Sequence, residues 1–204
     1  MTDQTSLGLR ERKKRDTRRA LSDATLALAF EQGLENVVRE DIAARAGVSV
    51  RTFSNYFANK YEALAYRQIE RIQRTIELIR THPGEGPIWE IVTEAVLEPF
   101  VAELGPAAAP TPAQLTEVAK LVQAPETQGV LTRTLVQDLT AALAERTHTD
   151  PKRDLYPRLL AGAVIAAYEA ASENYAVCDP PVPITTLLRR ALSSLAAGLP
   201  APPS

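Results

Sequence analysis

The stretch from Asp41 to Lys60, DIAARAGVSVRTFSNYFANK, constrains the fold of this chain more than any other part of it. Two short helical patterns flank Gly47, which can adopt the positive φ needed to reverse the chain at no steric cost. Ser49 follows as a cap for the second helix, because its hydroxyl can accept a hydrogen bond from a first-turn backbone N–H. The stretch predicts two helices joined by a tight turn, the second covering about residues 50–57.

The second helix of this pair has an apolar face and a polar face. Phe53 and Phe57, four residues apart, predict its buried side. Four residues are left on the outward side: Val50, Arg51, Ser54 and Asn55. Arginine can donate two hydrogen bonds to guanine, asparagine can pair with adenine, and valine can contact a thymine methyl group. The outward side therefore predicts a helix that reads bases in the major groove, whereas the alternative is an ordinary helical hairpin.

Charge is distributed unevenly along the chain. Residues 1–82 carry 15 Lys and Arg against 11 Asp and Glu, whereas residues 83–204 carry 8 against 14. The first part is therefore net +4 and the second net −6, which add to the net −2 of the whole chain. A basic part joined to an acidic part predicts that only the N-terminal part approaches a polyanion.

The basic residues concentrate in one segment before the helix pair. Residues 10–19 hold seven basic and two acidic side chains, after a stretch at residues 1–9 that we expect to be a loose arm. The segment leads into a helix expected over about residues 15–32. We predict that Lys13 and Lys14 contact DNA phosphates, whereas a solvated basic arm is the alternative.

Proline usage predicts the domain boundary. All 15 prolines lie at Pro83 or later, and the breaker-rich run from His82 to Pro87 forms a natural junction. We predict a helix-turn-helix domain over residues 10–58 and a long connecting helix over residues 59–82. A larger helical domain is expected over residues 83–199, followed by a disordered tail over residues 200–204.

Residues 10–66 resemble the N-terminal domain of the tetracycline-repressor (TetR) family of bacterial regulators. The resemblance rests on a basic first helix, then Gly33-Leu34, then DIAARAGVSVRTFSNYFANKYEAL. It implies an all-α fold of about nine helices, with a three-helix DNA-binding domain and a larger ligand-binding and dimerisation domain. It further implies a homodimeric transcriptional regulator, expected to be a repressor, that reads a roughly palindromic operator in the cytoplasm beside the nucleoid.

The resemblance also assigns site residues by position. It directs Val50, Arg51, Ser54 and Asn55 toward bases, and it places three residues at the phosphate backbone: Thr52, Tyr56 and Lys60. The chain departs from the family where Val38 replaces a capping Thr and Arg39 replaces an apolar residue. We expect Arg39 to turn outward toward a phosphate, and Asn36 is a candidate substitute cap. The sequence gives no reason why the cap at Val38 is missing.

Two helices near the C-terminus are expected to pair with those of a second subunit. In the resembled family the final two helices usually form a four-helix dimer interface, and one helix-turn-helix alone would read too short a site. The alternative is that both helices pack only within one chain. The expected interface residues are Leu160, Val164, Leu187, Leu188, Ala191, Leu192 and Leu195.

The segment DLYPRL, residues 154–159, resembles a branch of these regulators with an acyl-CoA-like ligand domain. It implies an effector cavity for an apolar or acyl chain among the central helices. The candidate lining residues are Trp89, Phe100, Tyr168, Glu169 and Tyr175. A regulator that responds to no ligand is the main alternative, and neither the effector nor the target genes follow from the sequence.

Other function classes find little support in the residues. The only histidines, His82 and His148, have no metal-ligand spacing, and no glycine-rich phosphate loop is present. The single cysteine, Cys178, allows no intrachain disulfide and has no activating neighbour in the sequence. No run of about 18 apolar residues predicts a membrane span. We therefore expect no enzyme, cofactor, metal or membrane partner; a helical enzyme or scaffold is the distant alternative.

Overall fold

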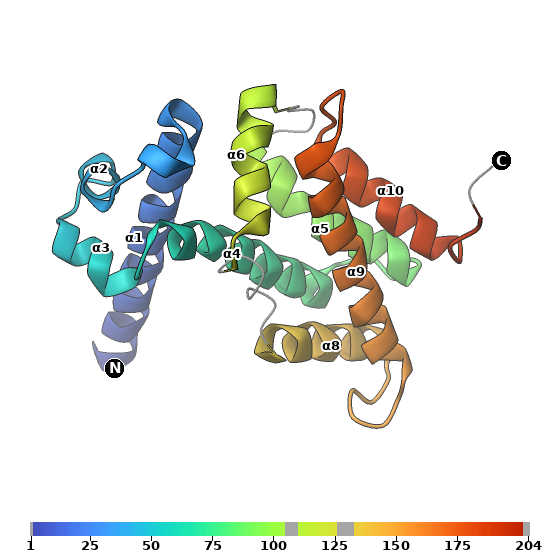
Figure 1. Cartoon of the computed structure of the whole chain (residues 1–204). Coiled ribbons are helices and arrows are strands. Elements are labelled where there is room, and N and C mark those ends of the chain that lie inside the picture. The colour runs from blue at the N-terminus through green and yellow to red at the C-terminus, as the bar shows by residue number, and fades with distance from the viewer. Residues whose placement is uncertain (1, 105–109, 126–132, 202–204) are drawn as a thin grey trace. The chain divides into compact units, whose positions relative to one another are not determined.

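The described part of the chain consists mainly of α-helices (Figure 1). The computed structural model describes residues 2–104, 110–125 and 133–201. In these ranges it contains nine α-helices, one 3-10 helix and no strand, which confirms the predicted all-α fold. The helices are α1 (Thr2–Gln32), η1 (Leu34–Asn36), α2 (Arg39–Arg45), α3 (Val50–Tyr56), α4 (Lys60–Thr81), α5 (Ile88–Leu104), α6 (Pro112–Gln123), α8 (Arg133–Thr147), α9 (Tyr156–Val177) and α10 (Ile184–Ala196).

Backbone contacts divide the chain into two units. The N-terminal unit comprises residues 1–69 with 123–130, and the C-terminal unit comprises residues 70–122 with 131–204. Helix α4 continues from the first unit into the second without a break. The domain limits expected from proline and charge remain predictions, and most of the expected tail lies outside the described residues.

The first helix is longer than the sequence suggested. It begins at Thr2, so the expectation of a loose arm before a helix starting near Arg15 was wrong. No proline interrupts this region, and its Leu, Arg, Lys and Glu residues have high helix propensity. Opposite charges four residues apart, at Glu11 and Arg15, further favour the helix. The basic segment is therefore carried on a helix.

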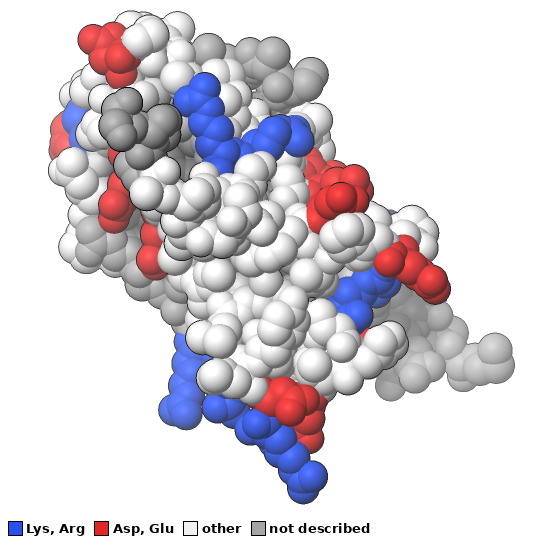
Figure 2. Space-filling model, turned by 90° about the vertical axis from the view of Figure 1, so that its right-hand side faces the viewer, with Lys and Arg blue, Asp and Glu red and all other residues white. Residues whose placement is uncertain are grey.

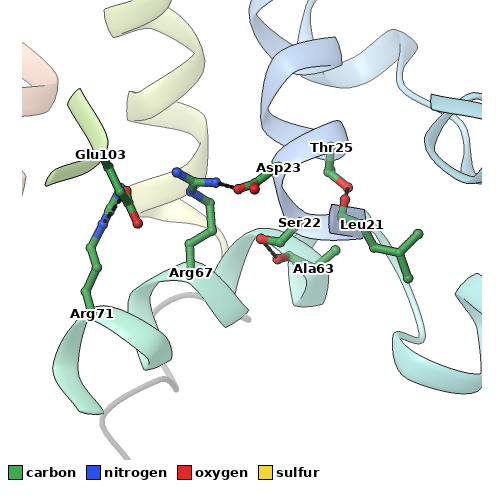
Figure 3. Close-up of polar contacts among 8 residues, drawn as sticks. All are labelled: Leu21, Ser22, Asp23, Thr25, Ala63, Arg67, Arg71 and Glu103. Atoms are coloured by element: carbon green, nitrogen blue, oxygen red, sulfur yellow. Dashed lines mark hydrogen bonds and ion pairs between the residues drawn. The ribbon is translucent and has the colours of Figure 1, made fainter. Parts of the chain in front are cut away.

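The N-terminal unit is closed around a small apolar core. Its most buried apolar side chains, each at most 2% exposed, are Leu21, Ala29, Leu34, Ile42, Ala43, Phe53 and Ala63. Ser22 also lies in this core, where its hydroxyl donates to the Ala63 carbonyl over 2.5 Å (Figure 3). The hydrogen bond satisfies a polar group that would be costly to bury alone, and it joins α1 to α4.

The helices of the C-terminal unit pack around a second apolar core. Helix α10 packs against α9 and α5, and α8 packs against α9. The core includes Ile79, Val92, Leu143, Leu188 and Leu192, each at most 1% exposed. None of the helices in the described ranges is long and apolar enough to cross a membrane. Those ranges also contain no cluster of His, Cys, Asp or Glu suited to a metal ion.

Candidate nucleic-acid interface

The predicted turn and cap between α2 and α3 are both confirmed. Gly47 has a φ of 67°, in the left-handed region that favours glycine. The Ser49 hydroxyl accepts a hydrogen bond from the Thr52 backbone N–H over 3.1 Å. These two local features fix where α3 begins and which way it leaves the turn.

The outward face of α3 matches the predicted base-reading face. Arg51, Ser54 and Asn55 are exposed, and Val50 is half-buried. The opposite side is anchored by Phe53, which is 2% exposed and lies 6.1 Å, ring centre to ring centre, from Phe57. The four candidate base contacts therefore lie on one short, rigidly held helix, as direct readout of a major groove requires.

Three of the predicted phosphate contacts have different surroundings. Lys13 and Lys14 are exposed on α1, with their ammonium groups open to solvent or to a bound polyanion. The Thr52 hydroxyl lies 2.9 Å from that of Ser49 and thus shares in the cap of α3. Its role toward a phosphate remains a prediction.

The start of α2 is as unusual in the structure as in the sequence. Val38 occupies the N-cap position without a side-chain hydrogen bond and is 48% exposed. Asn36 is not the substitute cap, because its side-chain oxygen accepts no N–H of α2; its amide nitrogen donates to the Gln32 carbonyl of α1 over 2.6 Å. The Arg39 side chain is 61% exposed and lies 3.6 Å from Glu40, so it faces outward as expected.

Lys60 has a structural role that the sequence did not reveal. Its ammonium donates to the carbonyls of Leu34, Glu35 and Val37, over 2.7, 3.1 and 3.2 Å. A lysine has three donors, so this arrangement uses all of them. It ties the first turn of α4 to the segment before α2 and gives a tertiary anchor where the local cap is missing. Contact between Lys60 and a phosphate remains a prediction that competes with these three bonds.

Two further polar contacts fix the helices of this unit. Arg45 of α2 donates two hydrogen bonds to the carboxylate of Glu31, over 2.8 and 2.5 Å, and thereby lowers the pKa of Glu31. Asn59 caps α4 as predicted, because its side-chain oxygen accepts from the Glu62 N–H over 2.9 Å. The first contact depends on the tertiary fold, whereas the second is local.

The predicted effector-lining residues of the C-terminal unit do not all come together. Phe100 is 5% exposed, and its ring centre lies 6.1 Å from that of half-buried Tyr168. Trp89 and Tyr175 are half-buried, and burial raises the pKa of the Tyr175 hydroxyl. Glu169 is exposed. The pair formed by Phe100 and Tyr168 is therefore the best-supported part of that set.

An ion pair beside Phe100 was missed by the sequence reasoning. Two nitrogens of Arg71 donate to one carboxylate oxygen of Glu103, over 3.0 and 2.5 Å (Figure 3). The guanidinium carbon lies 4.6 Å from the ring centre of Phe100. The two charged side chains are only 17% and 18% exposed. No sequence signal marks them, because charged residues on amphipathic helices are usually solvated.

Most residues predicted for the dimer interface are already buried within one chain. Five of the seven are at most 9% exposed, namely Leu160, Val164, Leu187, Leu188 and Leu192. The other two, Ala191 and Leu195, are half-buried. The predicted stripe is thus mainly the face with which α9 and α10 enter the core of the C-terminal unit. Contact of these residues with a second subunit remains a prediction.

Comparison with known proteins identifies similarity over both halves of the chain. A family model described as "MftR C-terminal domain" matches residues 86–200, and one described as "Bacterial regulatory proteins, tetR family" matches residues 21–65. The first match covers more than half of the chain.

Similarity to individual proteins is more limited. The repressor KstR of Rhodococcus jostii is 35% identical over 42% of this chain and 38% of its own length. The regulator TcmR of Streptomyces glaucescens is 37% identical over 48% of this chain and 42% of its own length. The chain thus matches only about two fifths of each curated relative.

One solved structure shows the same fold over nearly the whole chain. FadR of Thermus thermophilus, a repressor in complex with lauroyl-CoA, has a TM-score of 0.55 and 17% sequence identity. The match covers 92% of this chain and 97% of that one. At this identity the likeness supports the fold alone.

Proposed function

The chain belongs to the tetR family of bacterial regulatory proteins, and we propose that it is a homodimeric repressor released from its operator by a small apolar or acyl-chain ligand. Acting on chromosomal DNA, it works in the cytoplasm. The observation that carries DNA binding is the exposed face of α3, on which Arg51, Ser54 and Asn55 stand outward behind the Gly47 turn.

A gel-shift assay tests the proposal directly. The duplexes are the DNA flanking the protein's own gene and a sequence selected from a random library. We expect binding that weakens steeply with salt, because basic side chains displace counterions from the phosphates. Absence of binding to both duplexes contradicts the proposal.

Arg51→Ala is expected to relax specificity at one base position in each half-site and to cost about 1–3 kcal/mol of binding free energy. The physical reason is the loss of a two-bond pair to guanine. Arg39→Ala provides the matched comparison. Loss of a phosphate contact weakens binding to all DNA sequences alike and lowers the slope of log K against log salt. Competition gel shifts with single-base operator variants separate the two effects, and an unchanged base preference for Arg51→Ala contradicts its assignment.

We place the dimer interface on the exposed face of α9. Four residues spaced at three or four positions form this face: Leu159, Gly162, Ala166 and Ala170. Leu159 is 60% exposed, and the small residues permit close approach of a second helix. Figure 2, in which the right-hand side of Figure 1 faces the viewer, shows a broad area of side chains other than Lys, Arg, Asp and Glu. A second copy fits this face because one helix-turn-helix reads only half of a two-fold site.

Ala166→Arg is expected to convert the dimer into a monomer, because a long charged side chain replaces a methyl group at a close helix contact. Light scattering coupled to size exclusion measures the change in mass. Glu77→Arg, at an exposed position of α4, controls for added positive charge. A dimer that survives Ala166→Arg at low micromolar concentration excludes this face as the interface.

The effector part of the proposal rests on the family membership and on the Phe100–Tyr168 pair in the C-terminal unit. An apolar chain is the ligand class that buried aromatic rings favour. The ligand releases the dimer from DNA if it binds the DNA-bound conformation less tightly than a second conformation. In that second conformation the two α3 helices no longer fit successive major grooves. Titration of the DNA complex with long-chain acyl-CoA and with free fatty acids tests this class, and absence of release by both contradicts it.

A further inference from the structure

Arg18 of α1 lies between two tyrosine rings of the N-terminal unit. Its guanidinium carbon is 5.6 Å from the ring centre of Tyr56, at the end of α3, and 5.9 Å from that of Tyr66 on α4. All three side chains are half-buried. The Tyr66 ring is in turn 5.7 Å from Phe57, which belongs to the core under α3. A single arginine therefore joins the basic helix to the recognition helix.

Among the residues that the structure describes, no group accepts a hydrogen bond from the Arg18 guanidinium, and the Tyr56 hydroxyl has no partner. Two carboxylates of α1 form ion pairs with other arginines, Asp23 with Arg67 (Figure 3) and Glu31 with Arg45. Packing over two rings holds the guanidinium in place, and its N–H groups stay available for a further partner.

We propose that Arg18 and Tyr56 together form a clamp for one DNA phosphate at the flank of the recognition helix. The inference rests on the proposed DNA binding. A planar guanidinium suits two oxygens of a phosphate, and a phenolic hydroxyl beside it adds a third donor. Because Tyr56 follows Asn55 directly, a phosphate held here fixes how α3 enters the groove. Arg18 thus positions the base-reading residues as well as adding affinity.

The test compares Arg18→Met with the wild type on a duplex that the wild type binds. Methionine keeps an unbranched stem over the rings and removes the charge. We expect the dissociation constant to rise about tenfold, and the slope of log K against log salt to fall by about 0.9. Arg189→Met, which removes an exposed charge from α10, is the control and leaves the slope unchanged. Arg18→Gln repeats the measurement with a planar polar group, so that a folding defect in one variant, seen by thermal unfolding, does not decide the result.

A second arm tests whether the two residues share one phosphate. Tyr56→Phe alone weakens binding, and in combination with Arg18→Met it adds less than its separate effect. Methylphosphonate substitution, one phosphate at a time, identifies a position that matters to the wild type and no longer matters to Arg18→Met. Unchanged slopes in both Arg18 variants, or strictly additive effects at every phosphate, overturn the clamp. Wild-type protein that binds no duplex overturns the proposed function instead.

Discussion

Arg71→Met is expected to lower the free energy of unfolding of the C-terminal unit by about 3–5 kcal/mol. The carboxylate of Glu103 is only 18% exposed, and without Arg71 it loses a cation that offsets part of its desolvation. The Phe100 ring also loses the guanidinium that lies over it. Urea unfolding followed by circular dichroism measures the effect.

The double variant Arg71→Met/Glu103→Leu is the decisive comparison. Removing both charges eliminates the desolvation cost of both groups, so the double variant recovers much of the lost stability. Arg74→Met is a suitable control, because its pair with Glu98 is about half exposed and contributes little. If the double variant is as unstable as the sum of the single variants, the pair is not coupled and the assigned mechanism is wrong.

Lys60→Met is expected to destabilise the N-terminal unit by about 2–4 kcal/mol. Three backbone carbonyls, those of Leu34, Glu35 and Val37, lose a charged donor, and hydrogen bonds to charged groups contribute about 1.5–3 kcal/mol each before water replaces part of them. The segment before α2 then has neither this anchor nor a cap at Val38. Urea unfolding measures the loss, and Lys14→Met, at an exposed position, should leave stability unchanged.

DNA binding by Lys60→Met separates the two roles of this lysine. If the ammonium serves the three carbonyls, the variant binds more weakly while the salt slope remains that of the wild type. If it instead holds a phosphate, the slope falls by about 0.9 and stability changes little. A capping residue introduced as Val38→Thr should restore part of the stability lost in Lys60→Met, because it supplies the missing hydrogen bond to α2.

Local features of the N-terminal unit were predictable because each depends on a few neighbouring residues. The positive φ of Gly47, the cap by Ser49 and the cap by Asn59 involve partners within three positions. The outward set on α3 follows from the spacing of Phe53 and Phe57. These features were sufficient to predict the fold class and the base-reading face of α3. The length of α1 was misjudged, because residues 1–9 lack apolar periodicity and were expected to form a loose arm.

Contacts between residues far apart in the chain could not be predicted from the sequence. Lys60 meets Leu34 across 26 positions, and Arg71 meets Glu103 across 32. Arg18 is one of seven basic residues in its segment, and only the fold brings its guanidinium over Tyr56. Charged side chains on helices give the same pattern whether they are solvated or paired, so periodicity cannot separate these roles.

The sequence by itself determined the helical fold, the turn before α3 and the residues that this helix turns outward, because helix periodicity and caps are local properties. Only the tertiary structure decided which apolar face of α9 is buried in the chain's own core. Leu160 and Val164 are buried there, whereas Leu159 and Ala166 are exposed. A helix that is apolar all round offers two possible faces, and the choice depends on where α8 and α10 pack.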